Sequence, residues 1–471
     1  MKRPNILILY TDQQRWDALG AAGNTEIKTP QLDRLAARGA TFSHHFVQNP
    51  VCMPSRISML SGRYPSTLGI TDMGVPVPET IITLPHMLAQ YGYRSANIGK
   101  LHFLPHANRD HRLPHPAYGF DHLEIADEPG VYEDAYRAWV RQQAPDQMDG
   151  ISAGIPPATQ VWQQTMGIDD GVVHRGDPQG RHDFDRGIPF AAAVHLTHSA
   201  FVGEQTAEFI KAAGDQPFLC IAGFYSPHAP WIAPQIYLDL YDNESLSLPQ
   251  FPSPIDNQRP ADENAPFSDA QLRRAKQGYY AMISEMDHCV GRILAALDAS
   301  GTRDNTIVVF TSDHGEWLGD HLRYGKGYPA DDAVSRVPLI IAAPGGQERQ
   351  EHGGIVEAVD IVPTLLELAG IQIPPFLQGE SLAPLLAGSA DRSKASALTE
   401  GPGWKSLRSE SYRYLAHADG RENLWDMRSD PGAYHDVAGN ADYQIALAEC
   451  RHLLLTRLLA MERPLPRAWT Y

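Results

Sequence analysis

Four short apolar segments, each followed closely by side chains that bind metals or anions, constrain the fold of this chain more than any other feature. The segments cover residues 6–10, 95–98, 218–225 and 306–311, and a fifth apolar run covers residues 338–342. Helical patterns lie between them, at residues 30–38, 84–91, 202–213 and 268–299. Strands that alternate with helices predict an α/β fold with a mostly parallel sheet, flanked by helices on both faces.

The polar residues after these segments are expected to meet at one edge of the sheet. They are Asp12, Lys100 with His102, His228, and Asp313 with His314. Ligands of such sheets bind beyond the carboxyl ends of the strands. A single Asp or His after a strand is common, but four strand ends of this kind favour a metal- or anion-binding site.

The organisation along the chain indicates a large domain and a small one. We expect a large domain at residues 1–375, with an insertion at about 105–198 that is rich in His, Pro, Gly and Asp. Short polar-apolar runs and a final helical pattern predict a smaller α+β subdomain at residues 376–471.

Charge limits the partners of the chain. The formal net charge of −17 argues against nucleic acid and against an anionic membrane surface. An anionic small-molecule substrate would then need a local positive site. The first apolar run is too short for a signal peptide, so cytoplasmic residence is expected. A homo-oligomer is compatible with this sequence.

Residues 52–56, Cys-Met-Pro-Ser-Arg, are the sharpest local pattern. Pro54 suits a first helical turn, which would place Cys52 at a helix N-terminus that favours anions. Arg56 lies one turn along and can reach the same spot. Taken alone, a structural cysteine is the better interpretation, and buried thiols are expected at Cys220, Cys289 and Cys450.

The same residues resemble a known family. Cys52, Pro54, Ser55 and Arg56 match the Cys-x-Pro-Ser-Arg signature of the type I sulfatases, in the alkaline phosphatase superfamily. The resemblance continues in the family's order through residues 4–12, 29–36, 99–102, 312–321, 336–339, 360–365 and 423–431. It spans nearly the whole chain outside the insertion, and it implies an alkaline-phosphatase-like fold and a functional Cys52.

In that family a maturation enzyme, here a transient partner, oxidises the signature cysteine to formylglycine. The resemblance implies the same for Cys52. One hydroxyl of the hydrated aldehyde attacks sulfur and expels the alcohol. The second hydroxyl then loses its proton, the aldehyde re-forms and sulfate leaves, a release that a serine could not provide.

The resemblance also implies a metal site formed by Asp12, Asp313, His314 and residue 52. Calcium is the family norm and suits oxygen ligands, while the histidine leaves manganese or magnesium open. Many sulfatases carry a second Asp where this chain has Gln13. The Gln13 amide oxygen can still bind a metal, but it adds no charge.

Six residues are expected to act on the substrate and the nucleophile. Besides Cys52, they are Arg56, Lys100, His102, His228 and Lys326. Arg56, Lys100 and His102 would stabilise the diol, with His102 as a base for the release step. His228 and Lys326 would bind sulfate, and His228 could protonate the leaving group. Lys326 lies in a segment that departs from the family pattern. His321 could support a metal ligand.

Three functions are compatible with this sequence. The leading one is a sulfuric ester hydrolase of the arylsulfatase type. The second is a phosphonate monoester or phosphodiester hydrolase with the same nucleophile, because both ester types carry one charge on a tetrahedral centre. The third is a non-catalytic binding protein on a decayed hydrolase fold, which the filled polar positions disfavour.

Overall fold

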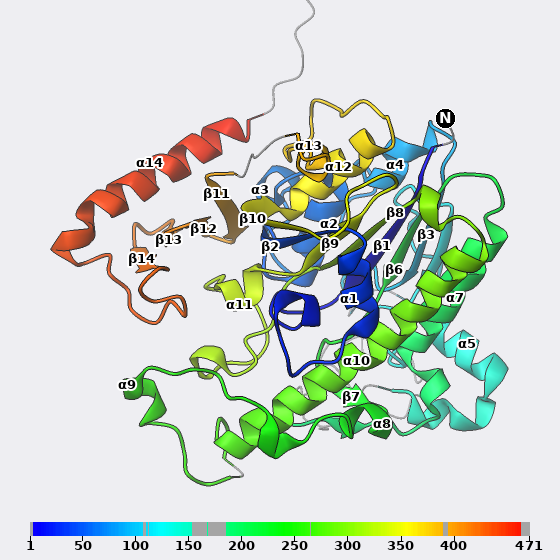
Figure 1. Ribbon diagram of the computed structural model, residues 1–471, viewed down its shortest axis with the longest axis horizontal. Helices are drawn as coiled ribbons and strands as arrows, with labels where there is room; N and C mark the ends of the chain where they lie inside the picture. The colour runs from blue at the N-terminus through cyan, green and yellow to red at the C-terminus, as the bar shows by residue number, and fades with distance from the viewer. Residues whose placement is uncertain are drawn as a thin grey trace, which may run out of the picture.

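An eight-stranded sheet lies at the centre of the computed structural model, which describes residues 3–106, 110–111, 113–152, 167, 185–263, 265–389 and 394–462 (Figure 1). The strand order is β10-β2-β9-β8-β1-β6-β3-β4. The strands are β1 (Asn5–Thr11), β2 (Ala40–Phe46), β3 (Arg94–Gly99), β4 (His122–Ile125), β6 (Phe218–Gly223), β8 (Thr306–Ser312), β9 (Leu339–Ala342) and β10 (Gln350–Glu357). β9 is antiparallel to its neighbours and the other seven strands run in one direction. The prediction of a mostly parallel sheet is confirmed.

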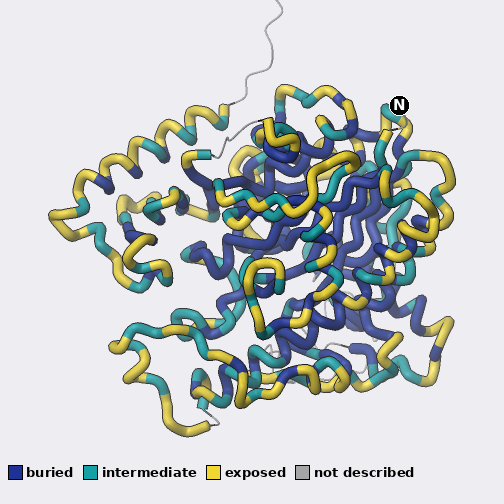
Figure 2. Tube along the Cα trace, viewed as in Figure 1, coloured by how far each residue is buried: buried dark blue, intermediate teal, exposed yellow. Residues whose placement is uncertain are grey.

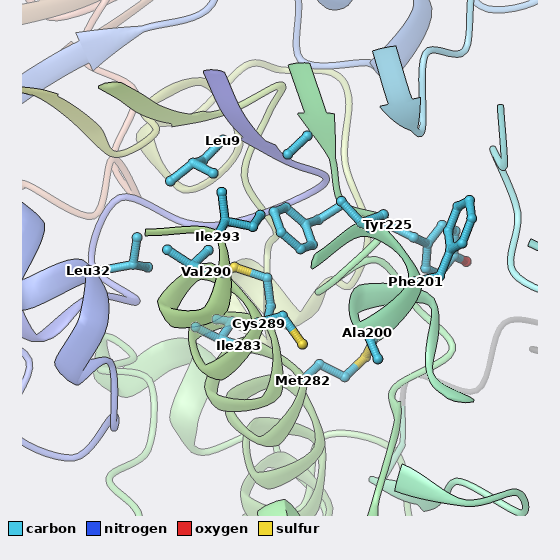
Figure 3. Close-up of a cluster of buried hydrophobic side chains, with 14 of the residues drawn as sticks. Leu9, Leu32, Ala200, Phe201, Tyr225, Met282, Ile283, Cys289, Val290 and Ile293 are labelled. Carbon is cyan, nitrogen blue, oxygen red and sulfur yellow. The ribbon is translucent and has the colours of Figure 1, made fainter. Parts of the chain in front are cut away.

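Helices cover both faces of this sheet. One face carries α1 (Pro30–Ala37), α7 (His198–Ala212) and α10 (Asp269–Ala299), and the other carries α2 (Cys52–Ser61), α4 (Leu84–Ala89) and α12 (Ile361–Leu368). Alternate side chains of β1 enter opposite cores, because successive residues of a strand point to opposite faces. Leu9 enters the first core, where Figure 3 shows it near Leu32 of α1 and Ile293 of α10. Figure 2 shows the strands buried between the two helical layers.

Three strands of the sheet escape sequence-based prediction, namely β2, β4 and β10. β4 is only half buried along its length, and β10 begins with half-exposed and exposed residues. Such strands carry mixed polar and apolar side chains instead of a continuous apolar run. β4 also lies inside the predicted insertion, so part of that range belongs to the main sheet. Residues 153–166 and 168–184 of the insertion lie outside the described residues.

A separate antiparallel sheet forms the C-terminal subdomain. Its strands are β11 (Ser396–Gly401), β12 (Trp404–Ser409), β13 (Tyr412–His417) and β14 (Glu422–Asp426). Helix α14 (Gln444–Ala460) packs Leu447 and Leu454 against Leu407 and Leu424 of this sheet. The small α+β subdomain is thereby confirmed, while its first residue, 376, stays a prediction.

The remaining short elements connect these layers. They are α3 (Pro65–Leu68), α5 (Ala135–Gln143), α8 (Gln235–Leu238), α9 (Ser253–Asp256), α11 (Asp332–Ser335), α13 (Ala383–Leu386), β5 (Ile188–Pro189) and β7 (Ile232–Ala233). No helix of the described residues combines the length and apolar character needed to cross a membrane. All four cysteines are buried free thiols, as predicted for Cys220, Cys289 and Cys450.

A buried ion cluster joins α14 to the main sheet. Lys394 Nζ lies 2.6 Å from Glu357 Oε2 and 2.5 Å from Asp360 Oδ1. Arg457 of α14 also pairs with Glu357 and lies 2.6 Å from the Tyr64 hydroxyl. Burial acts to raise the pKa of Glu357, but Lys394 and Arg457 lower it to about 2. The two parts of the molecule therefore share a set of buried charges.

Replacing Lys394 with methionine is expected to lower the free energy of unfolding by about 3–5 kcal/mol, because it leaves two buried carboxylates without that cation. Chemical denaturation measures the change. Lys211→Met is the matched control, since Lys211 pairs with Glu208 on the surface, and its effect should stay under about 1 kcal/mol. Equal losses in the two variants would show that the buried cluster contributes no special stability.

Candidate active site

The predicted metal ligands meet beyond the carboxyl ends of β1 and β8. β1 ends at Thr11, directly before Asp12, and β8 ends at Ser312, directly before Asp313 and His314. The strands pair in parallel with Thr11 opposite Ser312, so both turns leave the same edge of the sheet. The potential ligand atoms of four buried residues lie within 4.8 Å of one another: Asp12, Cys52, Asp313 and His314.

Cys52 enters this cluster as the first residue of α2. The preceding residue, Val51, is extended, and Pro54 lies in the first turn, where its missing N–H costs no helical hydrogen bond. Cys52 Sγ lies 3.2 Å from His314 Nε2 and 3.8 Å from Asp12 Oδ1. Burial and the Asp12 carboxylate raise the pKa of the thiol to about 11. The encoded thiol is therefore protonated at neutral pH.

Two buried cations lie against the carboxylates of the cluster. Lys100 follows β3, and its Nζ lies 2.5 Å from Asp12 Oδ2. Arg56, one turn along α2, donates from Nε to Asp313 Oδ2 at 2.7 Å. Burial alone would raise the pKa of Asp12, but Lys100 and the other nearby cations lower it well below its ordinary value. Asp12 thus stays ionised in a buried site.

Lys326 lies next to the thiol, and His228 lies next to Lys326. Lys326 Nζ is 2.7 Å from Cys52 Sγ and 3.0 Å from His228 Nε2. The other ring nitrogen of His228, Nδ1, lies 2.6 Å from the Ala229 carbonyl oxygen and can donate to it. That tautomer leaves Nε2 to accept from Lys326. A cation is therefore adjacent to residue 52, with an imidazole beside that cation.

His102 is a buried, neutral imidazole beside the cluster. Its backbone has a φ of 55°, and its N–H donates to Asp127 Oδ1 at 2.9 Å. Its ring stacks on His106 with 4.4 Å between centroids, and neither ring nitrogen has a hydrogen-bond partner among the described residues. Burial, His106 and Lys100 lower the pKa of His102 well below its ordinary value. The ring is thus in the proton-accepting form.

Gln13 lies beside the ligand cluster in a left-handed backbone conformation, with a φ of 71°. Its backbone N–H donates to Asp313 Oδ1 at 3.1 Å, and its side-chain amide donates to Glu316. Gln13 Oε1 is buried and accepts no hydrogen bond within the described part of the chain. Because an unsatisfied buried oxygen is unfavourable, this atom fits a site that a cation completes.

The donor set as a whole fits a divalent cation. His314 Nδ1 lies 2.9 Å from the Gly315 carbonyl oxygen and can donate to it, which leaves the Nε2 lone pair facing Cys52. Burial lowers the pKa of His314 to about 4, so the ring is neutral. Two carboxylates, an amide oxygen and one imidazole are ligands suited to calcium, manganese or magnesium.

Among the described residues, hydrogen bonds and ion pairs connect the predicted site residues except His102, whose ring stacks on His106. Their roles in turnover stay predictions. His321 differs from expectation: its Nε2 lies 2.8 Å from the Gly432 carbonyl oxygen and its ring stacks on Tyr434, so it contacts the C-terminal subdomain. Asp331 and Asp332, in the segment that departs from the family pattern, pair with arginines of the same subdomain.

Glu316 is a buried site residue to which sequence analysis assigned no role. It accepts the Gln13 amide and the backbone N–H groups of Leu318 and Gly325. Burial raises the pKa of Glu316 to about 7, against the effect of these donors. In the sequence, Glu316 follows the predicted ligands Asp313 and His314 closely, which indicated that it lies near the site. The sequence does not indicate which side chain Glu316 contacts.

Comparison with known proteins identifies the family of this chain. Residues 4–371 match the sulfatase family, and residues 319–460 match the C-terminal family of N-sulphoglucosamine sulphohydrolase. An arylsulfatase of Clostridium perfringens is 28% identical over 488 residues, covering 98% of this chain and 95% of that protein. A multifunctional alkaline phosphatase superfamily protein of Trinickia caryophylli is 27% identical, covering 94% and 93%. The crystal structure of a phosphonate monoester hydrolase of Agrobacterium radiobacter matches with a TM-score of 0.78 and 25% identity, covering 98% and 96%.

A mostly parallel sheet with these side chains at its carboxyl edge defines a hydrolase of the alkaline phosphatase superfamily. The match over residues 4–371 identifies the group within it: the chain belongs to the sulfatase family, and it is a sulfatase-type hydrolase.

Proposed function

We propose that this protein hydrolyses sulfate monoesters of small molecules, in the manner of an arylsulfatase, with a formylglycine made from Cys52 and a divalent cation. The observation that carries the proposal is the place of Cys52. Its Sγ lies at the start of α2, 3.2 Å from His314 Nε2 and 2.7 Å from Lys326 Nζ. Residue 52 thus contacts both a possible metal ligand and a cation suited to sulfate.

Oxidation of Cys52 would solve a chemical problem of the encoded residue. Burial raises the pKa of the thiol to about 11, which makes it a weak nucleophile at neutral pH. A formylglycine-generating enzyme, acting as a transient partner, would replace the thiol with an aldehyde. The hydrated aldehyde supplies one hydroxyl for attack on sulfur and a second whose deprotonation releases sulfate.

Asp12, Gln13, Asp313 and His314 would hold the cation together with residue 52. A bound cation lowers the pKa of the nucleophile and polarises a substrate oxygen. The oxygen-rich set favours calcium, with manganese or magnesium as alternatives. Lys100 offsets the charge of Asp12 on the other side, since its Nζ lies 2.5 Å from Asp12 Oδ2.

The remaining side chains would bind the substrate and move protons. Lys326 would bind the sulfate oxygens. His228 would protonate the leaving alcohol from Nε2, the nitrogen that faces Lys326 at 3.0 Å, after Nε2 has taken up a proton. His102 would take the proton released when the aldehyde re-forms, because its buried ring is neutral. Arg56 would hold Asp313 and stabilise negative charge near residue 52.

A second candidate is a phosphonate monoester or phosphodiester hydrolase that uses the same residues. The structural similarity to a phosphonate monoester hydrolase favours it, since that match covers 98% of this chain. Sulfate monoesters and phosphonate monoesters each carry one negative charge, so Lys326 and the cation would bind either.

A comparison of two esters with the same leaving group tests the proposal. The kcat/KM for 4-nitrophenyl sulfate is expected to exceed that for 4-nitrophenyl phenylphosphonate, measured on one preparation with Cys52→Ala protein as the blank. A kcat/KM far higher for the phosphonate would transfer the assignment to the second candidate.

Mass analysis of the peptide that bears residue 52 tests the modification. Protein produced together with a formylglycine-generating enzyme is expected to contain the aldehyde, and turnover should rise in proportion to the converted fraction. Protein produced without that enzyme should retain the thiol. Full turnover by a preparation that contains only thiol would refute the proposed nucleophile.

A further inference from the structure

We propose that Glu316 is a positioning residue that fixes the orientation of the Gln13 amide, so that Gln13 presents its oxygen to the cation. The inference rests on the proposed metal site and adds a residue to it. Gln13 replaces a carboxylate that many sulfatases carry, and an amide binds a cation only through its oxygen. The orientation of this one group therefore decides whether Gln13 is a ligand.

The backbone of Gln13 is held at two points. Its N–H donates to Asp313 Oδ1 at 3.1 Å, and its carbonyl oxygen accepts from the Tyr279 hydroxyl at 2.7 Å. The φ of 71° is unfavourable for a residue with a Cβ, and such conformations persist where surrounding contacts impose them. The backbone position of Gln13 is therefore fixed independently of its side-chain contacts.

Glu316 then determines which end of the Gln13 side chain faces the cation. Glu316 Oε1 accepts the backbone N–H groups of Leu318 and Gly325, at 3.1 and 2.5 Å. Glu316 Oε2 accepts the amide nitrogen of Gln13. All three partners are donors, so Glu316 accepts in each of these contacts and the Gln13 amide turns its nitrogen toward it.

At the other end of the amide, the Gln13 oxygen is unsatisfied within the described residues. Gln13 Oε1 is buried and has no hydrogen-bond partner among the described residues. The large majority of buried side-chain polar atoms have a hydrogen-bond partner. A cation next to Asp313, whose Oδ1 already contacts the Gln13 backbone, would satisfy it. The same carboxylate also holds Gly325, the neighbour of Lys326, so Glu316 aligns two parts of the site.

The decisive variant is Glu316→Gln. The new side chain must keep its oxygen toward the N–H groups of Leu318 and Gly325, so its NH₂ group meets the NH₂ group of Gln13. The Gln13 amide then turns over and presents nitrogen to the cation. We expect the Kd for Ca²⁺ to rise about 10–100-fold, the range usual for residues that orient a metal ligand. Calorimetric titration of chelator-treated protein measures it.

A reciprocal exchange separates orientation from mere loss of structure. In the double variant Gln13→Glu with Glu316→Gln, the amide at position 316 donates to one carboxylate oxygen at position 13, and the other oxygen faces the cation. Binding of Ca²⁺ should return to near the wild-type Kd. Glu400→Gln is the matched control. Glu400, in β11 of the C-terminal sheet, is buried and accepts the backbone N–H of Ser66 in α3. It should leave the Kd unchanged.

The outcomes distinguish this inference from the proposed function. If wild-type protein binds neither Ca²⁺ nor Mn²⁺ or Mg²⁺, the metal site itself is wrong. If wild-type protein binds Ca²⁺ and folded Glu316→Gln protein binds it equally well, Glu316 has no positioning role. If thermal melting shows that Glu316→Gln does not fold, the exchange variant decides alone, and a folded exchange variant without Ca²⁺ binding overturns the inference.

Discussion

Cys52→Ala protein is expected to lose turnover of aryl sulfates by roughly four orders of magnitude or more, the scale on which removal of a catalytic nucleophile acts. A methyl side chain cannot be oxidised to an aldehyde and offers no oxygen to attack sulfur. The fold should persist, because Cys52 is a small buried residue at the start of α2. Steady-state rates report the loss, and thermal melting confirms that the protein is folded.

Two further cysteine variants sharpen this result. Cys450→Ala is the matched control, since Cys450 is also buried but lies in α14, and its rate should equal that of the wild type. Cys52→Ser should react once and stall, because a single hydroxyl lacks the second group that expels sulfate. Near-normal rates for Cys52→Ala would remove residue 52 from the mechanism. Sustained turnover by Cys52→Ser would argue against release through the diol.

The second large effect is expected for Asp313→Asn, which should lower the metal content of purified protein sharply. Asp313 contributes one of the two carboxylates of the ligand cluster. Its replacement also leaves Arg56, whose Nε lies 2.7 Å from Asp313 Oδ2, without that charge. Residues that only orient a metal ligand change affinity by roughly 10–100-fold. Loss of a direct ligand should weaken Ca²⁺ binding at least as much. Elemental analysis after dialysis measures it.

Asp320→Asn is the matched control for this substitution. Asp320 lies in the same loop region but pairs with Arg15, at 2.7 Å, instead of the cluster. Its metal content should equal that of the wild type. Unchanged metal content in Asp313→Asn protein would take Asp313 out of the ligand set and with it the proposed site at the end of β8.

The strands that carry the site were predictable because each is a local pattern. β1, β3, β6 and β8 are apolar runs, and the residues after them reach one edge once the strands are parallel. β2, β4 and β10 were not predictable in this way, because partly exposed strands carry polar side chains such as His44 of β2. Their assignment depends on hydrogen bonds to strands distant in the sequence.

The amino-acid sequence was enough to predict the α/β class, the strand ends that bear Asp12 and Asp313, and the position of Cys52 at a helix start. These follow from periodicity and from turn chemistry, which act over a few residues. Two contacts become visible only in the folded chain: Glu316 accepts the Gln13 amide, and Lys394 pairs with both Glu357 and Asp360. The physical reason is that a hydrogen bond or buried ion pair depends on the orientation of two side chains in space, and no local pattern encodes that.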